Sequence, residues 1–312
     1  MQRRSFLQTV SALGAAAGLP GLANAANGKT AHDPAAKFGL KVSEVPFRKN
    51  AQGRQLMARI YQPVGAGPFP VVLDLHGGAW QRKDRTAEEP MDRAIAASGV
   101  LVVAIDMTLS GEAPYPACVQ DASYGIRWLK SRAAEWKGDA STLGLYGSSS
   151  GGHVAELLAM RPNDQRYNAI PFAKPGIDTS VAYVATRSPI SNPFTRWEQA
   201  VRKPSENLVK ASKAFFNPWE SIHEGSPQEI LDRKEKAVLK PLLVMQGELD
   251  DNVLPAEQKK FAESYRAAGG EVQYELFKAS VHEWVAEPGP QTTAAHEMAK
   301  RFIAKQLNRA SG

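Results

Sequence analysis

A serine flanked by glycines carries the clearest chemical signal in this chain. Residues 143–151 read Leu-Gly-Leu-Tyr-Gly-Ser-Ser-Ser-Gly, and a helix-like stretch follows from Gly152 to Met160. Gly-x-Ser-x-Gly between a strand and a helix is the pattern of a nucleophile elbow, a sharp turn that exposes the serine hydroxyl. A serine held in this way can attack a carbonyl carbon and form a covalent acyl intermediate.

Any of three consecutive serines could be the nucleophile, and the residues that flank each one decide between them. Only Ser149 has glycine both two residues before it and two residues after it, at Gly147 and Gly151. The elbow needs small residues there because the turn brings its flanks close to neighbouring backbone. Ser149 is therefore the predicted nucleophile. The backbone N–H of Ser150, at the start of the helix, is predicted to donate to the oxyanion that develops on the carbonyl.

A second glycine pair lies upstream, at the end of an apolar run. Residues 69–80 read Phe-Pro-Val-Val-Leu-Asp-Leu-His-Gly-Gly-Ala-Trp. Such a run predicts a parallel strand that is covered on both faces. The backbone N–H groups of Gly77 and Gly78 can approach a ligand without side-chain obstruction, so they are predicted to be further oxyanion donors. A plain turn at the end of the strand is the alternative.

Acidic and basic partners for the serine follow two later strand patterns. Asp250 and Asp251 come after the apolar run 242–247, and His282 comes after the alternating run 272–277. An acid on such a loop can orient a histidine, but these two adjacent aspartates cannot both do so. The order Ser, then Asp, then His is the chain order of α/β-hydrolases.

The chain resembles α/β-hydrolases of the esterase and lipase group that carry a His-Gly-Gly loop, and in particular bacterial feruloyl-esterase-like and acetyl-esterase-like members. The resemblance covers residues from about 40 to about 308. The motifs that carry it are His76-Gly-Gly-Ala-Trp80, Pro116 with Asp121 and Trp128-Leu129, Gly147-Ser-Ser-Ser-Gly-Gly-His153, Gly247-Glu-Leu-Asp250 with Val253 and Pro255, and His282.

This resemblance implies a fold, a reaction and an acid. The fold is an α/β-hydrolase fold, with a mostly parallel eight-stranded sheet, helices on both faces and a small cap insertion. The reaction is cleavage of carboxylic esters by a Ser149–His282–Asp250 triad, since the family's acid stands three residues after the glycine at Gly247. The His-Gly-Gly-x-Trp motif also resembles arylformamidases, so amide hydrolysis stays open. A catalytically silent binding protein on the same fold is the alternative from another class.

Alternating strand and helix patterns independently favour a mostly parallel sheet with helices on both faces. The predicted strands are 42–48, 55–62, 71–75, 100–105, 142–146, 180–185, 242–246 and 272–277. The predicted helices are 87–97, 116–136, 152–160, 255–268 and 292–306. The active site is expected beyond the carboxyl ends of the strands.

Residues 186–238 are the least regular part of the chain and are rich in proline and aromatic residues. In the similar families, an insertion at this point often forms a cap over the pocket. Its aromatic side chains, with two others near the predicted site, are candidate walls for the substrate pocket. Alternatively, they pack the cap onto the body. The candidates are Trp80, Trp197, Phe215, Phe216, Trp219 and Trp284.

The N-terminal residues 1–25 have the features of an export signal. A basic start is followed by an apolar stretch that is too short to span a membrane, and Ala23-Asn-Ala25 forms a cleavage site. Arg3-Arg4 resembles a twin-arginine signal, although an ordinary secretory signal is the alternative. The expected mature protein is a single domain, residues 26–312, in the periplasm or outside the cell.

Composition narrows the ligands. The formal net charge is +6, but the basic residues are interspersed with acidic ones, so no nucleic-acid footprint is expected. The single cysteine, Cys118, excludes an intrachain disulfide. No metal-ligand spacing, dinucleotide motif or Walker motif occurs, so neither a metal nor a cofactor is expected. The expected partner is a small-molecule ester; the natural ester, its acyl length and the oligomeric state stay open.

Overall fold

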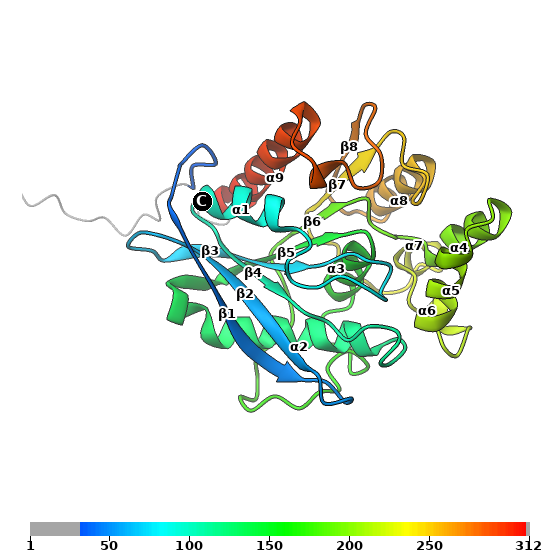
Figure 1. The fold of residues 1–312 in the computed structure, drawn as a ribbon, viewed down its shortest axis with the longest axis horizontal. Helices are drawn as coiled ribbons and strands as arrows, with labels where there is room; N and C mark the ends of the chain where they lie inside the picture. Colours follow the sequence, from blue (N-terminus) through cyan, green and yellow to red (C-terminus); the bar gives the residue numbers. More distant parts are fainter. Residues whose placement is uncertain (1–31, 310–312) are drawn as a thin grey trace, which may run out of the picture. The chain divides into compact units, whose positions relative to one another are not determined.

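The computed structural model describes residues 32–309, and the predicted export signal lies outside them. Within these residues eight strands form one sheet, in the order β1-β2-β4-β3-β5-β6-β7-β8 (Figure 1). The strands are β1 (Leu40–Lys49), β2 (Gln55–Pro63), β3 (Phe69–Leu75), β4 (Leu101–Ile105), β5 (Gly138–Ser148), β6 (Val184–Arg187), β7 (Leu242–Gly247) and β8 (Val272–Phe277).

Only the first two strands break the parallel arrangement. β1 pairs antiparallel with β2, and β2 pairs antiparallel with β4. The pairs from β4 through β3, β5, β6 and β7 to β8 are all parallel. Parallel neighbours need long crossover connections, which the helices between them supply. The predicted eight-stranded, mostly parallel sheet is confirmed.

Successive strand residues point to opposite faces of the sheet, and in the central strands both sets are apolar. Helices therefore cover both faces. Val72 and Val102 belong to the apolar cluster that includes α1 and α9, whereas Leu73 and Val103 belong to the cluster that includes α2, α3 and α8. The larger helices are α1 (Glu89–Ala97), α2 (Ala117–Arg132), α3 (Ser150–Met160), α8 (Pro255–Ala267) and α9 (Pro290–Arg309). Two short 3₁₀ helices, η1 (Ala133–Trp136) and η2 (Trp284–Ala286), complete this part.

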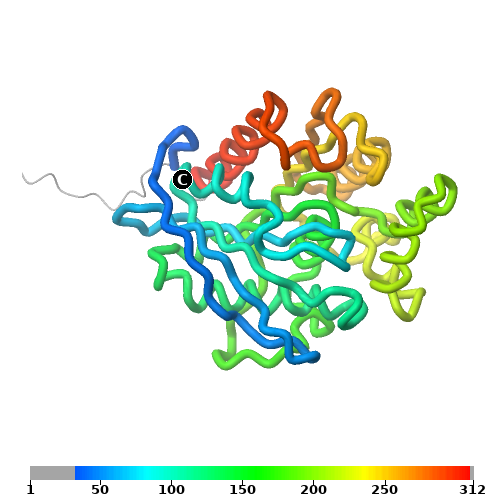
Figure 2. Tube along the Cα trace, in the orientation of Figure 1, coloured from blue at the N-terminus to red at the C-terminus, as the bar shows by residue number. Residues whose placement is uncertain are grey.

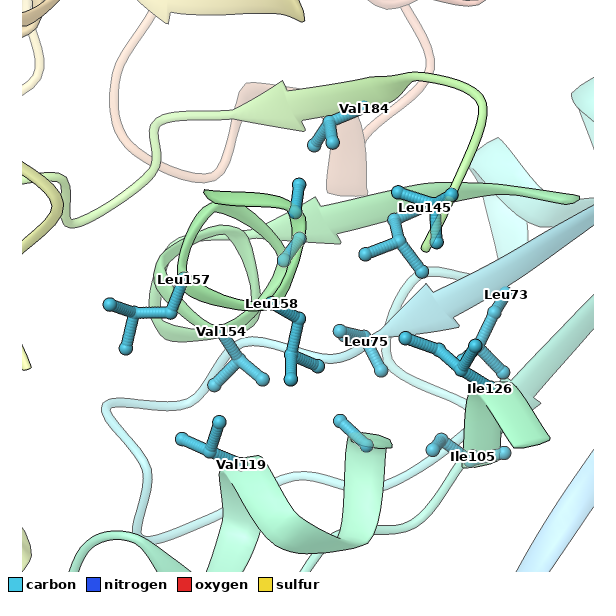
Figure 3. Packing of buried hydrophobic residues seen from close by; sticks show 14 of the residues in the cluster. Leu73, Leu75, Ile105, Val119, Ile126, Leu145, Val154, Leu157, Leu158 and Val184 are labelled. Carbon is cyan, nitrogen blue, oxygen red and sulfur yellow. The ribbon is translucent and has the colours of Figure 1, made fainter. Parts of the chain in front are cut away.

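The helix that follows the nucleophile strand is packed tightly into this core. Every residue of α3 is buried. Figure 3 shows Val154 and Leu158 of α3 between Leu75 of β3 and Val119 of α2. The body of the protein therefore fixes the position at which β5 passes into α3.

β6 lies further along the chain than the sequence predicted. The strand was expected at 180–185 but runs from Val184 to Arg187. Its ladder pairs Val184–Arg187 with Leu145–Ser148 of β5 on one side and with Leu242–Met245 of β7 on the other. Register with both neighbours, rather than the local apolar pattern, sets where this strand lies.

The insertion between β6 and β7 is helical, although no helix was predicted there. Within this fully described stretch the helices are α4 (Pro193–Arg202), α5 (Glu206–Phe215), α6 (Ser221–Glu224) and α7 (Pro227–Asp232), drawn from green to yellow in Figure 2. Pro193 and Pro227 stand at helix starts, where a missing N–H costs nothing. The side chains of Asn192 and Ser226 accept hydrogen bonds from Thr195 N and Glu229 N and cap these helices.

Among the helices of residues 32–309, none combines the length and the apolar character needed to cross a membrane.

Candidate active site

Ser149 stands on a strained turn between β5 and α3. Its φ is 50° and its ψ is −115°, a backbone conformation that residues other than glycine rarely adopt. A Cβ at Gly151 would lie 1.8 Å from Leu75 O, and a Cβ at Gly147 would lie 2.6 Å from Gly151 O. Both glycines are therefore required by close backbone approach, as the sequence pattern predicted.

Three predicted side chains meet at this turn. His282 Nε2 lies 3.0 Å from Ser149 Oγ, and His282 Nδ1 lies 2.8 Å from Asp250 Oδ2. The side chain of His282 is 13 % exposed and that of Asp250 is fully buried. The hydroxyl, the imidazole and the carboxylate therefore form one continuous chain of hydrogen bonds at the carboxyl ends of the strands.

Asp250, and not Asp251, is the acid in this chain. Asp250 Oδ1 accepts from the backbone N–H groups of Asn252 and Val253, and Oδ2 accepts from Gln246 Nε2. Burial acts to raise the pKa of Asp250, but the hydrogen bond and charge of His282, helped by the Val253 N–H, leave that pKa below its ordinary value. The Asp251 side chain is 73 % exposed and pairs with Lys203.

The glycine loop after β3 lies against Ser149. A Cβ at Gly77 would sit 3.3 Å from Ser149 Cβ, and Gly78 has a φ of +105° in a turn closed by Arg82 N to Gly78 O. Within residues 32–309, no protein acceptor pairs with the backbone N–H groups of Gly77, Gly78 and Ser150. These three predicted donors are available to a ligand beside Ser149.

A small cavity of about 10 Å³ lies beside the glycine loop and the start of α3, and Ser149 itself does not line it. Gly77 and Ser150 line it together with mostly apolar side chains. The other lining residues are His76, Trp80, Met107, Thr108, Leu109 and Cys118. A group bound there would lie next to the proposed oxyanion donors.

The two neighbouring serines have other partners. Ser148 Oγ donates to Glu88 Oε1 at 2.6 Å, and Ser150 Oγ accepts from Trp80 N at 3.1 Å. Ser148 therefore anchors the end of β5, and Ser150 holds the glycine loop to the start of α3. Ser149 is the serine whose hydroxyl contacts His282.

His153 joins the glycine loop to the insertion. Its Nδ1 accepts from Trp80 Nε1 at 3.2 Å, so its Nε2 donates to Gly225 O at 2.6 Å. Burial lowers the pKa of His153 to about 4. This neutral, fully bonded imidazole therefore packs behind the elbow.

The six aromatic candidates for the pocket fall into three groups. Trp80 stacks on Phe215 with ring centres 4.6 Å apart, and Phe216 packs edge-on against both rings. These three residues are at most 4 % exposed and pack the insertion onto the body, and Trp80 also lines the small cavity. Half-buried Trp197 and Trp219 contact each other within the insertion. Trp284 stacks on Phe277 in the core of the opposite sheet face.

A buried arginine that the sequence pattern did not predict lies beside the site. Arg196 of α4 is 4 % exposed, and its Nε and Nη2 donate to Asn252 Oδ1, two residues after Asp250. Its guanidinium lies 5.7 Å from the Trp80 ring centre. Burial lowers the pKa of Arg196 to about 10. The only sequence signal near Arg196 is Pro193, which begins its helix. The burial of Arg196 depends on tertiary packing and is not visible in the sequence.

No group of three or more His, Cys, Asp or Glu side chains in the part of the chain that the structure describes is arranged to hold a metal ion.

The chain is similar in sequence to several known proteins. Residues 59–265 match the model of the BD-FAE family. Esterase LipQ of Mycobacterium tuberculosis is 24 % identical over 76 % of this chain and 55 % of its own length. Carboxylesterase NlhH of the same species is 36 % identical over 34 % of each chain. The chain thus spans about half of the first of these relatives and a third of the second.

A solved structure shows the same fold. Esterase B from Lactobacillus Rhamnosis superimposes with a TM-score of 0.72 at 20 % sequence identity, over 88 % of each chain. The family match spans the glycine loop after β3, the elbow and the loop that carries Asp250, and the superposition covers 88 % of the chain. This chain therefore belongs to the BD-FAE family and has the α/β-hydrolase fold.

Proposed function

We propose that this protein is a serine hydrolase that cleaves carboxylic esters through an acyl-enzyme intermediate. The observation that carries the proposal is the hydrogen-bond chain from Asp250 through His282 to Ser149, on a strained elbow beside unpaired backbone donors. The relatives whose names include esterase or carboxylesterase support the same reaction class. Ester cleavage by this arrangement needs neither a metal nor a redox cofactor.

In the first half-reaction Ser149 Oγ attacks the ester carbonyl carbon while His282 Nε2 takes its proton. Asp250 keeps the proton of the neutral imidazole on Nδ1 and stabilises the imidazolium that forms. The backbone N–H groups of Gly77, Gly78 and Ser150 stabilise the negative charge on the carbonyl oxygen. The tetrahedral intermediate then expels the alkoxide, which takes the proton from His282 Nε2, and an acyl-Ser149 ester remains.

In the second half-reaction water replaces the alcohol. His282 Nε2 takes a proton from the water as its oxygen attacks the acyl carbon, and the same N–H groups hold the second oxyanion. Collapse of this intermediate releases the carboxylic acid and returns the proton to Ser149 Oγ. The cavity beside Gly77 and Ser150, with a volume of about 10 Å³, is the proposed place for a small substituent of the ester only.

We also propose that the protein acts after export. The support is the sequence of residues 1–25, with its paired arginines, apolar stretch and Ala23-Asn-Ala25 site.

The test of the reaction class is turnover of p-nitrophenyl acetate by the purified mature protein and by its Ser149→Ala form. Wild-type turnover that is lost in Ser149→Ala and kept in the exposed control Ser141→Ala supports the proposal. Longer p-nitrophenyl esters and methyl ferulate then define the preferred ester, and an aryl formamide measures the amide alternative. Absence of wild-type turnover on every substrate would favour a binding protein instead.

A further inference from the structure

A buried ion pair lies behind the triad and takes no part in the chemistry described above. Arg187 at the end of β6 donates from Nη2 to both carboxylate oxygens of Glu88, at 3.0 and 3.2 Å. The two side chains are 4 % and 3 % exposed. Two charges buried to this degree carry a large desolvation cost, so the pair calls for an explanation beyond stability.

One side of the pair holds the nucleophile. Glu88 Oε1 accepts the hydrogen bond of Ser148 Oγ at 2.6 Å. The backbone carbonyl of Arg187 accepts from Ser149 N at 2.9 Å. The last residue of β5 and the strained residue that follows it are thus tied directly to Glu88 and Arg187.

The other side of the pair holds the general base. Arg187 Nη1 donates to the backbone carbonyl of His282 at 2.6 Å. The guanidinium also lies 5.7 Å from the ring centre of Trp284, which stacks on Phe277 at the end of β8. One planar side chain therefore connects the loop that carries His282 to Glu88, which accepts the hydrogen bond of Ser148.

Neighbouring buried acids leave this connection intact. Burial, and next the charge of Glu88, raises the pKa of Asp74 well above its ordinary value. Burial, and next the charge of Asp74, raises the pKa of Asp92 in the same direction. Both shifts disfavour the charged carboxylate, and the contacts of Arg187 show that its carboxylate partner is Glu88.

We propose that the Glu88–Arg187 pair is a positioning device that sets the separation between Ser149 Oγ and His282 Nε2. The proposal rests on the esterase function proposed above, because only proton transfer between these atoms gives the separation a consequence. Neither side chain touches the reacting atoms. Their action passes through Ser148, the Ser149 backbone and the His282 carbonyl.

The geometry of the guanidinium explains why lysine cannot replace arginine at position 187. Its rigid fork donates to the Glu88 carboxylate and to the His282 carbonyl at the same time, which a lysine ammonium on a flexible stem cannot do in the same plane. A displacement of about 1 Å between reacting groups can cost about 100-fold in rate. The loss of the fork should thus appear in kcat rather than in KM.

The first test is Arg187→Lys, measured with p-nitrophenyl acetate and by thermal unfolding. We expect kcat to fall by about 10- to 100-fold while KM changes by less than about threefold. The matched control is Arg161→Lys, because the Arg161 side chain is also only 9 % exposed and is shared between the carbonyl and the carboxylate of Glu224, at the far end of α3. The control should lower Tm with no selective loss of kcat. An Arg187→Lys protein with kcat within about twofold of wild type would overturn the proposal.

The second test separates positioning from stability. The double variant Glu88→Leu/Arg187→Met removes both charges and leaves no unpaired ion, so its Tm should return toward the wild-type value. If the pair positions the triad, kcat stays low in this stable variant. Recovery of kcat together with Tm would mean that the pair has a structural role only.

Failure of the proposed function would look different. A wild-type protein that turns over no ester would refute the esterase function itself. A wild-type protein that is active, with an Arg187→Lys form that is equally active, would refute only the positioning role.

Discussion

Asp250 and Asp251 are neighbours in the chain with opposite surroundings. Asp250 is buried and bonded to His282, whereas Asp251 is exposed and bonded to Lys203. Asp250→Asn places an amide against Nδ1, favours the wrong imidazole tautomer and should lower kcat by about 10⁴-fold. Asp251→Asn should change kcat by less than about threefold. Steady-state kinetics on both variants measures this difference. Equal losses of kcat would show that the acid role is wrongly assigned to Asp250.

The pH profile depends on a single imidazole. His282 must be neutral to accept the Ser149 proton, so activity should rise with pH. The pKa of Asp250 lies below its ordinary value, so this carboxylate stays charged, and the pKa of His153 is about 4, so that ring stays neutral. Below the pH of maximal activity, log kcat/KM should therefore rise with pH with a one-proton slope. A two-proton slope would require a second titrating group in the site.

At the scale of the elements, the elbow works because two glycines admit close backbone. Gly151→Ala would place its Cβ 1.8 Å from Leu75 O, whereas a Cβ at Gly111 would meet nothing within 4 Å. We expect Gly151→Ala to cost about 3 kcal/mol or more of unfolding free energy, and Gly111→Ala to cost less than about 1 kcal/mol. Chemical denaturation of both variants measures the difference. Equal stability of the two variants would mean that the elbow can accommodate a Cβ at position 151.

The elements that follow simple periodicity were predictable from sequence. The strands other than β6, the long helices and the loops that carry Ser149, Asp250 and His282 were expected within about four residues of where they occur. β6 was misplaced because its register depends on two distant strands. The helices of the insertion were missed because five prolines suggested irregular chain, whereas Pro193 and Pro227 in fact begin helices.

Buried polar contacts were the least predictable part of the site. Nothing in the local sequence distinguishes Glu88, Arg187 or Arg196 from exposed residues of the same type. Each becomes buried only when segments far apart in the chain pack together. The positions of Ser149, Asp250 and His282 were predictable because each residue lies in a local motif. The buried polar contacts around them were not predictable, because they form between segments far apart in the chain.

At the scale of the whole molecule, the paired arginines before the folded domain predict the route of export. Replacing both Arg3 and Arg4 with lysine should block twin-arginine transport and hardly affect the ordinary secretory route, which reads charge and apolarity. Cell fractionation of the double variant, with activity as the readout, decides between the routes. Undiminished delivery outside the cytoplasm would indicate an ordinary secretory signal.

The covalent intermediate at Ser149 is the most direct test of the whole account. The mature protein would be mixed briefly with p-nitrophenyl acetate, quenched in acid and digested, and the peptide that contains residues 148–150 would be sequenced by mass spectrometry. The account predicts one acetyl group on Ser149 in the wild type and none in Ser149→Ala. An acetyl group on Ser148 or Ser150, or ester turnover that persists in Ser149→Ala, would contradict it.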